Sequence, residues 1–250
     1  MTRVDPVAAA GFASAAEVYE RARPSYPAEA VRWLVERTAL GPGKTVLDVG
    51  AGTGKLTRLL VPSGARVVAV EPIAEMRALI EGVETVDGTA EALPFDDASA
   101  DAITVAQAFH WFDLERALPE LHRVLRPGGS LVLVWNMRDL RDPVQRGVED
   151  LLAPLRAFTP QQQLGAWREP LARSPLFGEG ASRRFRFEQR FTADDLCARV
   201  ASTSFVAAMP ALEREALLAR VRAAVHGLPE PFPFPYETEV EAIPRTGDRG

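Results

Sequence analysis

His110 and Trp111 stand side by side in the segment AQAFHWFD, directly after an apolar run. The chain has only 3 His and 4 Trp, so two scarce residue types that often contact ligands meet at one predicted strand end. Imidazole is the one group in this segment that titrates near neutral pH and can act as a general base. We expect His110 and Trp111 to line a substrate pocket and Phe112 to pack against the next helix. The alternative is that Trp111 only packs and His110 caps a loop.

A second candidate site is the glycine-rich segment LDVGAGTG, where a predicted strand meets a predicted helix. Gly50, Gly52 and Gly54 allow a tight turn and a close approach of the backbone to a ligand. The helix that follows would offer backbone N–H groups to an anionic ligand. Asp48 precedes the loop. The alternative is a tight strand–helix turn that binds nothing.

The spacing of these glycines limits the choice of ligand. A dinucleotide-binding loop would place its last glycine at position 53 or 55, where the chain has Thr53 and Lys55. A phosphate-binding P-loop would need Ser or Thr after Lys55, and the chain has Leu56. Glu71 follows the next predicted strand, where a carboxylate can accept hydrogen bonds from both hydroxyls of a ribose. The pattern therefore indicates a ligand with a ribose and no need for a pyrophosphate cradle.

Composition narrows the class of protein. The chain has 250 residues, 47% of them hydrophobic, which suffices for one α/β domain with a sizeable core. The net charge of -5 disfavours a nucleic-acid-binding surface. Cys197 is the single cysteine, so neither an internal disulfide nor a cysteine-based metal site is expected. Asp113, after the segment with His110, is a lone carboxylate and not part of a metal-binding group, and we interpret it as a helix N-cap. The Ala-rich N-terminal segment predicts a mobile arm, and the absence of a long apolar run predicts a cytoplasmic protein without a membrane span.

The first half of the chain alternates apolar runs with helical patterns. Such alternation is typical of a parallel sheet covered by helices on both faces. Strands are predicted at residues 45–50, 65–71, 83–88, 101–109 and 128–136, and helices at 27–38, 53–61, 73–82 and 114–125.

The second half has a different pattern. Residues 139–181 are rich in proline and predict short helices and loops. Phenylalanines alternate with charged residues over 184–191, which predicts a half-exposed antiparallel strand near a sheet edge. Thr192 and Asp195 predict a capping box before the next helix. A helix over 211–226 and a final strand close the chain, and that strand should pair freely only after Pro235.

Taken together, the motifs VLDVGAGTGKLT, VVAVEP, GTAEALPFDDASAD, AQAFHWFD and RVLRPGGSLVLVWNMRD occur in the order and spacing of a known family. They resemble class I S-adenosylmethionine-dependent methyltransferases, and within these the small-molecule branch with trans-aconitate-type enzymes. The resemblance is strong over about residues 15–140. It implies a Rossmann-like α/β fold with a seven-stranded, mostly parallel sheet, the last strand antiparallel, and S-adenosyl-L-methionine as cofactor across the carboxyl ends of the strands.

The resemblance also implies roles for individual residues. The loop with Asp48, Gly50, Gly52 and Gly54 would hold the methionyl part and Glu71 the ribose. The adenine would be bordered by Pro72, Ile73, Met76, Thr89, Ala90 and Glu91. Next to the reactive methyl would lie Ala106 and Gln107, and a lid would supply Tyr19 and Arg23. Asp48 could instead brace the loop, Met76 could merely pack, and Arg23 could be a surface charge.

The expected protein is a single methyltransferase domain over residues 1–250. Its core sheet should span about 40–137 and 182–243, and its lid segments about 1–30, 139–181 and 193–228. We expect methyl transfer to a small molecule by a monomer or homodimer, with no metal, nucleic acid or membrane. Two alternatives remain open. The first is a protein that binds the cofactor without activity, and the second is a nucleotide-dependent oxidoreductase.

Overall fold

The computed structural model describes residues 23–156, 165 and 167–247, and these residues form a seven-stranded sheet. The strand order is β3-β2-β1-β4-β5-β7-β6. The strands are β1 (Thr45–Val49), β2 (Arg66–Val70), β3 (Glu84–Val86), β4 (Ala100–Ala106), β5 (Leu125–Arg138), β6 (Ala181–Phe191) and β7 (Phe232–Pro244). β1 to β5 pair in parallel, and β7 runs antiparallel to both β5 and β6. The predicted mostly parallel sheet with an antiparallel last strand is confirmed.

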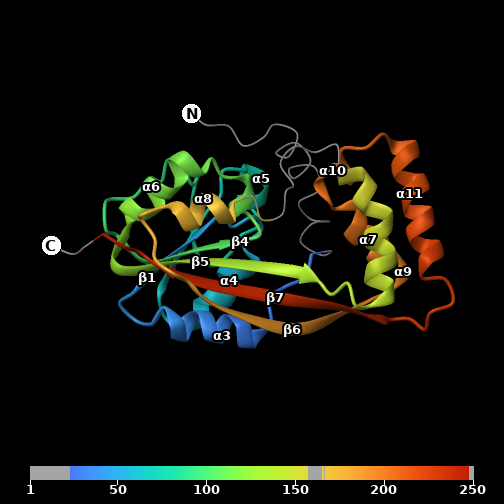
Figure 1. Cartoon of the computed structure of the whole chain (residues 1–250), viewed down its shortest axis with the longest axis horizontal. Coiled ribbons are helices and arrows are strands. Elements are labelled where there is room, and N and C mark those ends of the chain that lie inside the picture. The colour runs from blue at the N-terminus through green and yellow to red at the C-terminus, as the bar shows by residue number, and fades with distance from the viewer. Residues whose placement is uncertain (1–22, 157–164, 166, 248–250) are drawn as a thin grey trace.

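Helices cover both faces of this sheet (Figure 1). α3 (Ala28–Arg37) and α4 (Lys55–Leu60) bury Leu34 and Leu60 against one face, in a cluster with Val46 and Val132. α6 (Leu114–Val124) and α8 (Arg168–Arg173) bury Leu121 and Leu171 against the other. Shorter elements connect the strands: η1 (Val61–Ser63), α5 (Ala74–Arg77) and η2 (Phe109–Trp111).

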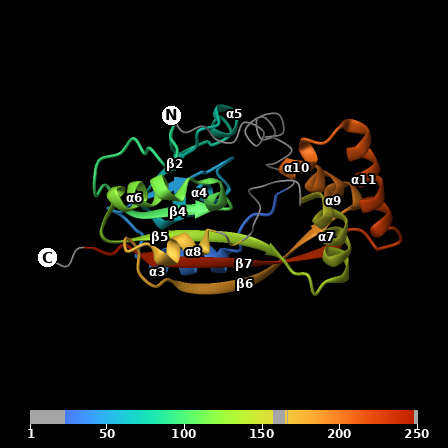
Figure 2. The same ribbon diagram turned by 45° about the horizontal axis from the view of Figure 1, so that its top comes forward.

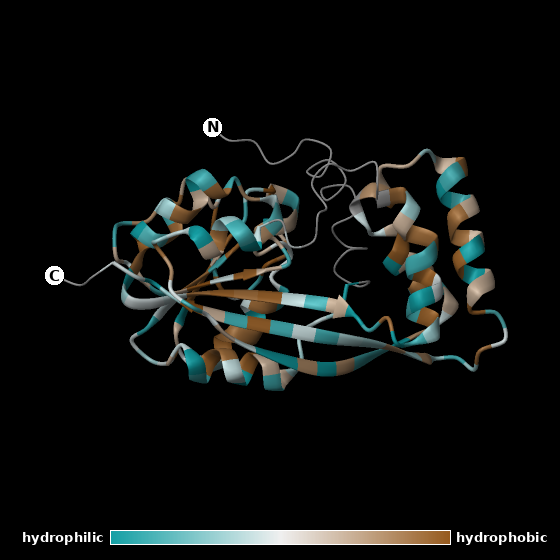
Figure 3. Ribbon diagram, viewed as in Figure 1, coloured by the Kyte–Doolittle hydropathy of each residue, from teal (hydrophilic) through white to brown (hydrophobic). Residues whose placement is uncertain are grey.

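Four further helices gather at the far end of β6 and β7, and we call them the cap (Figures 1 and 2). They are α7 (Pro143–Arg156), α9 (Ala193–Ala201), α10 (Ser204–Ala207) and α11 (Ala211–Ala224). The cap has its own core, in which Leu152, Leu196 and Val221 pack on Phe234 and Tyr236 of β7. Figure 3 shows hydrophobic and hydrophilic residues mixed along these helices, and α7 and α9 are amphipathic, as expected of helices around a small core.

Several local predictions agree with the structure. β6 is an edge strand, antiparallel to β7, with Phe185 and Phe191 buried and the intervening arginines exposed. Thr192 and Asp195 form the capping box of α9, with the Asp195 N–H donating to Thr192 Oγ1 at 3.1 Å and the Thr192 N–H donating to Asp195 Oδ2 at 2.9 Å.

The expectation for the start of β7 was wrong. β7 begins at Phe232 and pairs with β6 across both Pro233 and Pro235. The Pro235 carbonyl accepts the side-chain amide of Gln145 at 2.7 Å and the backbone N–H of Asp139 at 3.3 Å, so this edge of β7 faces away from β6. Alternate residues of a strand point their backbone N–H and C=O groups to the same side, so Pro233 and Pro235 both face away from β6. The missing N–H groups of the two prolines therefore remove no hydrogen bond between β6 and β7.

Two predicted segments also differ. The helix expected over 73–82 shortens to α5, because Ile80 turns in to pack close to Gly54 and Gly82 adopts a φ of 75°. The segment 139–181 contains the 14-residue helix α7, since Val148 and Leu152 form an apolar stripe that the cap core buries. α8, from the same segment, packs on the sheet and not on the cap. The assignment of residues 1–250 to a single domain stays a prediction.

Candidate functional site

The carboxyl ends of the parallel strands bring most of the predicted site residues to one edge of the sheet. β1 pairs with β2 on one side and β4 on the other, with Asp48 opposite Thr104. Loops after parallel strands meet at the same edge, which is where ligands bind in open α/β sheets.

The glycine loop after β1 is bound tightly to the protein. The N–H of Gly50 donates to the Val70 carbonyl at 2.8 Å, and the N–H of Gly54 donates to the Ala51 carbonyl at 2.9 Å. Gly50 has a φ of 68°, and a Cβ there would lie 2.7 Å from the Cβ of Ala108. Gly52 has a φ of 59°, and a Cβ there would meet nothing within 4 Å. Both positions have the left-handed backbone that favours glycine. A side chain at Gly50 would in addition collide with the protein, whereas a side chain at Gly52 would enter open space.

Asp48 is buried beneath this loop and braces it. Its Oδ2 accepts the hydroxyl of Thr57 in α4 at 2.6 Å, and its Oδ1 accepts the hydroxyl of Thr104 in β4 at 2.8 Å. Burial raises the pKa of the Asp48 carboxyl, and the two hydroxyl bonds oppose that rise. Two roles were considered for Asp48, and these hydrogen bonds to Thr57 and Thr104 correspond to the bracing role.

Glu71, directly after β2, joins the glycine loop to the neighbouring strand. Its Oε2 accepts the N–H of Gly52 at 2.8 Å, and its Oε1 accepts the N–H of Ile73 at 2.9 Å. The residue is only 4% exposed, and burial raises the pKa of its carboxyl. Each oxygen uses one acceptor position on the backbone and retains another.

The residues expected around an adenine lie in the two loops beyond Glu71. Met76 in α5 and Ala90 after β3 are buried, while Pro72 is partly exposed. Thr89 forms a bridge with Ala92. Glu91 accepts the backbone N–H of Asp113 at 2.9 Å and so links this loop to the start of α6. Asp113 occupies the predicted N-cap position of α6, but its side chain makes no capping bond.

The end of β4 turns sharply into η2. Gln107 has a φ of 60°, a left-handed conformation that is uncommon for a residue other than glycine. Its N–H donates to the Val134 carbonyl at 3.0 Å, and its side-chain amide donates to the Asn136 carbonyl at 3.4 Å. These bonds to β5 fix the turn that presents His110 and Trp111. Phe112 packs in the core against Phe109, at 5.7 Å between ring centroids, as predicted.

His110 lies within an aromatic group. Its ring centroid is 4.6 Å from Trp111 and 5.5 Å from Trp135, and Trp135 stacks on Trp167 at 5.5 Å. Burial, and to a lesser extent the positive charge of Arg23, lower the pKa of His110 to about 4. Its Nδ1 is buried and has no hydrogen-bond partner among the described residues. His110 is therefore neutral at pH 7 and has a ring nitrogen available to a ligand.

A cavity of about 520 Å³ connects the glycine loop with the cap. Of the predicted site residues, it is lined by Arg23, Gly50, Gly52, Ala106, Gln107, His110 and Trp111. The other described ones, outside its wall, are Asp48, Gly54, Glu71, Pro72, Met76, Thr89, Ala90 and Glu91. Tyr19 lies outside the described residues. Arg23 donates from Nη2 to the Ser202 carbonyl after α9 at 3.1 Å, so it contacts the cap.

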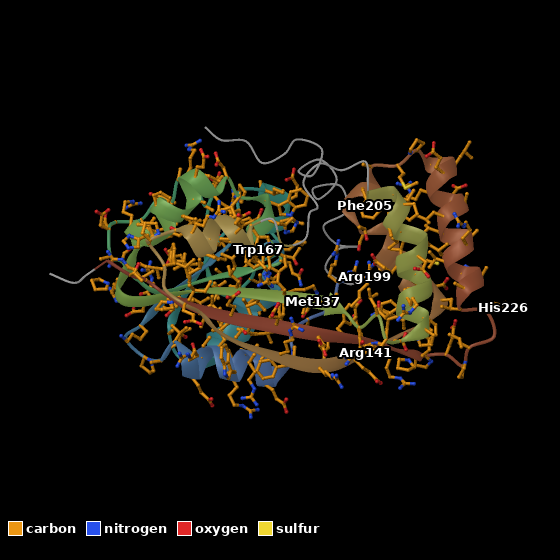
Figure 4. The ribbon with its side chains drawn as sticks, in the orientation of Figure 1. Met137, Arg141, Trp167, Arg199, Phe205 and His226 are labelled. Carbon is orange, nitrogen blue, oxygen red and sulfur yellow. The ribbon has the colours of Figure 1, made fainter. Side chains whose placement is uncertain are left out.

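Sequence reasoning missed much of the cavity wall. His110 was identified because it follows the carboxyl end of a predicted strand. Trp135 and Met137 lie near the carboxyl end of β5, so the same reasoning could have identified them. Trp167, Arg199 and Tyr236 also line the cavity, and they come from segments without a recognisable motif. Figure 4 shows Met137 and Trp167 on the sheet side of this region and Arg199 and Phe205 on the cap side.

The acidic groups of the cavity wall are paired with arginines. Glu149 forms an ion pair with Arg138, and Glu239 pairs with Arg168 at 3.0 Å and with Arg184 at 3.2 Å. Within the described ranges, no group of three or more His, Cys, Asp or Glu could hold a metal ion. In the same part of the chain, no helix has the length and hydropathy needed to span a membrane.

Comparison with known proteins agrees with this geometry. A family model described as a methyltransferase domain matches residues 47–133. An uncharacterized methyltransferase of Mycobacterium tuberculosis (strain ATCC 25618 / H37Rv) is 44% identical over 215 residues, which cover 84% of each chain. An uncharacterized methyltransferase-like protein of Schizosaccharomyces pombe (strain 972 / ATCC 24843) is 34% identical over 216 residues, again 84% of each chain. A solved structure of a putative type II methyltransferase from Anaeromyxobacter dehalogenans superimposes with a TM-score of 0.66 at 28% identity, covering 89% of this chain and 97% of that one. The chain belongs to the class I S-adenosylmethionine-dependent methyltransferases.

Proposed function

We propose that this methyltransferase transfers the methyl group of S-adenosylmethionine to a small molecule held in the cavity between the glycine loop and the cap. One observation carries the proposal: a single cavity is lined by Gly50 and Gly52 at one wall and by Arg199 and Phe205 of the cap at another. Its volume of about 520 Å³ lies in the range typical of small-ligand pockets. The methyl-donating end of the cofactor and the acceptor can therefore meet in one cavity.

The residues at the sheet edge fit S-adenosylmethionine. Open space beside Gly52 leaves room for the methionyl part, where any larger side chain would intrude. Glu71 retains one acceptor position on each carboxylate oxygen, and we assign these to the ribose hydroxyls. The backbone N–H groups of Gly50, Gly52 and Gly54 are already bonded within the protein, so the shape of the loop matters more than free donors.

We assign the adenine to the loops that follow β2 and β3. Pro72, Met76, Thr89, Ala90 and Glu91 lie beyond Glu71 on the same edge of the sheet. Met76 and Ala90 provide apolar contact and Thr89 a hydroxyl that can accept from the adenine amino group. Asp48 supports the glycine loop through its bonds to Thr57 and Thr104. Arg23, from the segment before α3, would contact the cofactor from the cavity wall.

The protein's own part in catalysis is alignment. Bound S-adenosylmethionine supplies an activated methyl group. The end of β4, from Ala106 to Trp111, would hold the acceptor nucleophile in line with that group and exclude water. Alignment of this kind can contribute about 7–11 kcal/mol to lowering the barrier.

His110 is better suited to orienting the acceptor than to removing its proton. A base with a pKa of about 4 has little affinity for the proton of an amine or a phenol at neutral pH. A neutral imidazole whose Nδ1 has no partner among the described residues can still form a hydrogen bond with the acceptor. Trp111, next to it, would supply apolar contact.

The cofactor assignment can be tested by calorimetry. S-adenosylhomocysteine should bind with one site per chain, and NAD(P)H should not bind. Binding of NAD(P)H alone would point to the oxidoreductase alternative instead. A screen with methyl-labelled S-adenosylmethionine against small acids, phenols, amines and indoles then separates an enzyme from a protein that only binds the cofactor.

Finer assignments stay predictions. These are the kinship with trans-aconitate-type enzymes, a cytoplasmic location, the absence of nucleic acid as substrate, and a monomeric or homodimeric state. Size-exclusion chromatography with light scattering would measure the last of these directly.

A further inference from the structure

The wall of the cavity includes a buried arginine, Arg199, whose charge is not paired with any described carboxylate. Arg199, in the last turn of α9, is 8% exposed and lines the cavity from the cap side. Its Nε and Nη1 atoms are buried and form no hydrogen bond with any described residue. Arginine is rarely buried unless its charge is paired, because desolvation of an unpaired guanidinium is costly.

The acidic groups of the cavity wall do not compensate this charge. Glu149 is engaged by Arg138, and Glu239 is engaged by Arg168 and Arg184. Arg23 donates to the Ser202 carbonyl directly after the helix that carries Arg199, so it lies on the same side of the cavity. Among the described residues, no carboxylate of the cavity wall is bonded to Arg199.

Other buried polar atoms of the cavity wall also lack partners among the described residues. Thr203 Oγ1 follows α9, and the Tyr236 hydroxyl comes from β7 beneath the cap. The indole N–H of Trp135 and the Nδ1 of His110 are likewise unpaired on the sheet side. Buried polar groups in folded proteins are nearly always bonded to protein, water or a ligand, so a polar ligand in this cavity would supply the partners that these atoms lack.

The rest of the wall suits a flat molecule. Trp135 and Trp167 stack with an interplanar angle of 15°, and His110 and Trp111 extend this surface toward the end of β4. Three of the chain's 4 tryptophans thus line one cavity. Aromatic walls of this kind favour planar, unsaturated ligands.

We propose that the methyl acceptor is a planar aromatic or unsaturated molecule that carries a carboxylate, and that Arg199 binds this carboxylate. Thr203 and Tyr236 would donate further hydrogen bonds to it, while the aromatic wall contacts the planar body. Arg199 is then a specificity-determining residue supplied by the cap. This inference rests on the proposed function, because it takes the cavity to be the acceptor site.

The test compares acids with their neutral amides. The probes are 4-hydroxybenzoate and 4-hydroxybenzamide, cinnamate and cinnamamide, and indole-3-acetate and indole-3-acetamide. Each is titrated into the full chain saturated with S-adenosylhomocysteine. Wild type should bind at least one of the acids tenfold or more tightly than its amide. Arg199→Met should abolish this preference, and Arg220→Met, which removes an exposed arginine from α11, should retain it.

A second measurement needs no acceptor. Because the Arg199 charge is buried without a partner, the thermal midpoint of ligand-free Arg199→Met should equal or exceed that of wild type. A clearly lower midpoint would show that Arg199 holds the fold together, and would overturn the proposal. Equal affinity of wild type for acid and amide in all three pairs would overturn it too, as would an acid preference that survives Arg199→Met.

The cofactor titration separates the two levels of inference. If S-adenosylhomocysteine fails to bind to wild type, the cofactor assignment fails. If it binds equally to wild type, Arg199→Met and Arg220→Met while no acid is preferred, only the carboxylate proposal fails.

Discussion

The Oε2 atom of Glu71 lies 2.8 Å from the backbone nitrogen of Gly52 and accepts its hydrogen bond. One carboxylate after β2 thus holds the glycine loop after β1 in place. In the proposed complex the same carboxylate would contact the ribose, so loop geometry and cofactor binding depend on one side chain.

Glu71→Ala should weaken S-adenosylmethionine and S-adenosylhomocysteine alike, by about 1–3 kcal/mol, because it removes hydrogen bonds to a charged group. Isothermal titration measures both affinities. Glu75→Ala, which changes an exposed acid in α5, is the control and should bind as wild type does. Unchanged affinity of Glu71→Ala for both ligands would show that the ribose assignment is wrong.

The two loop glycines should respond differently to alanine. Both have positive φ, so alanine costs about 1–2 kcal/mol of backbone strain at either position. At Gly50 the new methyl group would also collide with the Ala108 Cβ at 2.7 Å, so Gly50→Ala should be the less stable variant in urea unfolding. At Gly52 the methyl group enters open space beside the cavity, so Gly52→Ala should lose cofactor affinity out of proportion to its stability. Full cofactor affinity in Gly52→Ala would place the methionyl part elsewhere.

Substitutions of His110 distinguish orientation from proton removal. If His110 orients the acceptor, His110→Gln should keep most of the single-turnover rate, and His110→Ala should chiefly raise KM. If it were a general base, both variants would lose about 10²-fold or more, since an amide cannot take up a proton. Cofactor affinity should stay at the wild-type value in each variant. An His110→Ala enzyme with normal rate and KM would remove the residue from the site.

The buried imidazole should also affect stability at low pH. The pKa of His110 is about 4 in the folded chain, against an ordinary value of 6.5. Between these values the unfolded chain binds a proton that the folded chain does not. Stability is therefore fully present above pH 6.5 and falls as the pH drops toward 4, by about 3 kcal/mol in total.

Urea unfolding of wild type and His110→Gln across this range tests the point. The variant should lose less stability on acidification. His226→Gln, which replaces an exposed histidine after α11, should follow wild type. Parallel curves for His110→Gln and wild type would contradict the lowered pKa of His110.

The local features of this protein could be predicted from its sequence because they depend on neighbours along the chain. The alternation over 184–191 identified the edge strand β6, and Thr192 with Asp195 identified the start of α9. The glycine spacing argued against a dinucleotide loop, Glu71 indicated a ribose, and the position of His110 and Trp111 after β4 predicted that they line a cavity. Where local propensity met a tertiary contact, as at α5 and α7, prediction of the helix length failed.

Only the tertiary structure decided how the rest of the site is built. Arg199, Trp167 and Tyr236 line one cavity with Gly52, although they are far apart in sequence and carry no motif. Asp48 could be assigned a bracing role only once Thr57 and Thr104 were seen on its two oxygens. The physical reason is the same in each case. Whether a polar side chain is paired or left for a ligand depends on which distant segments pack around it, and a sequence motif does not encode those partners.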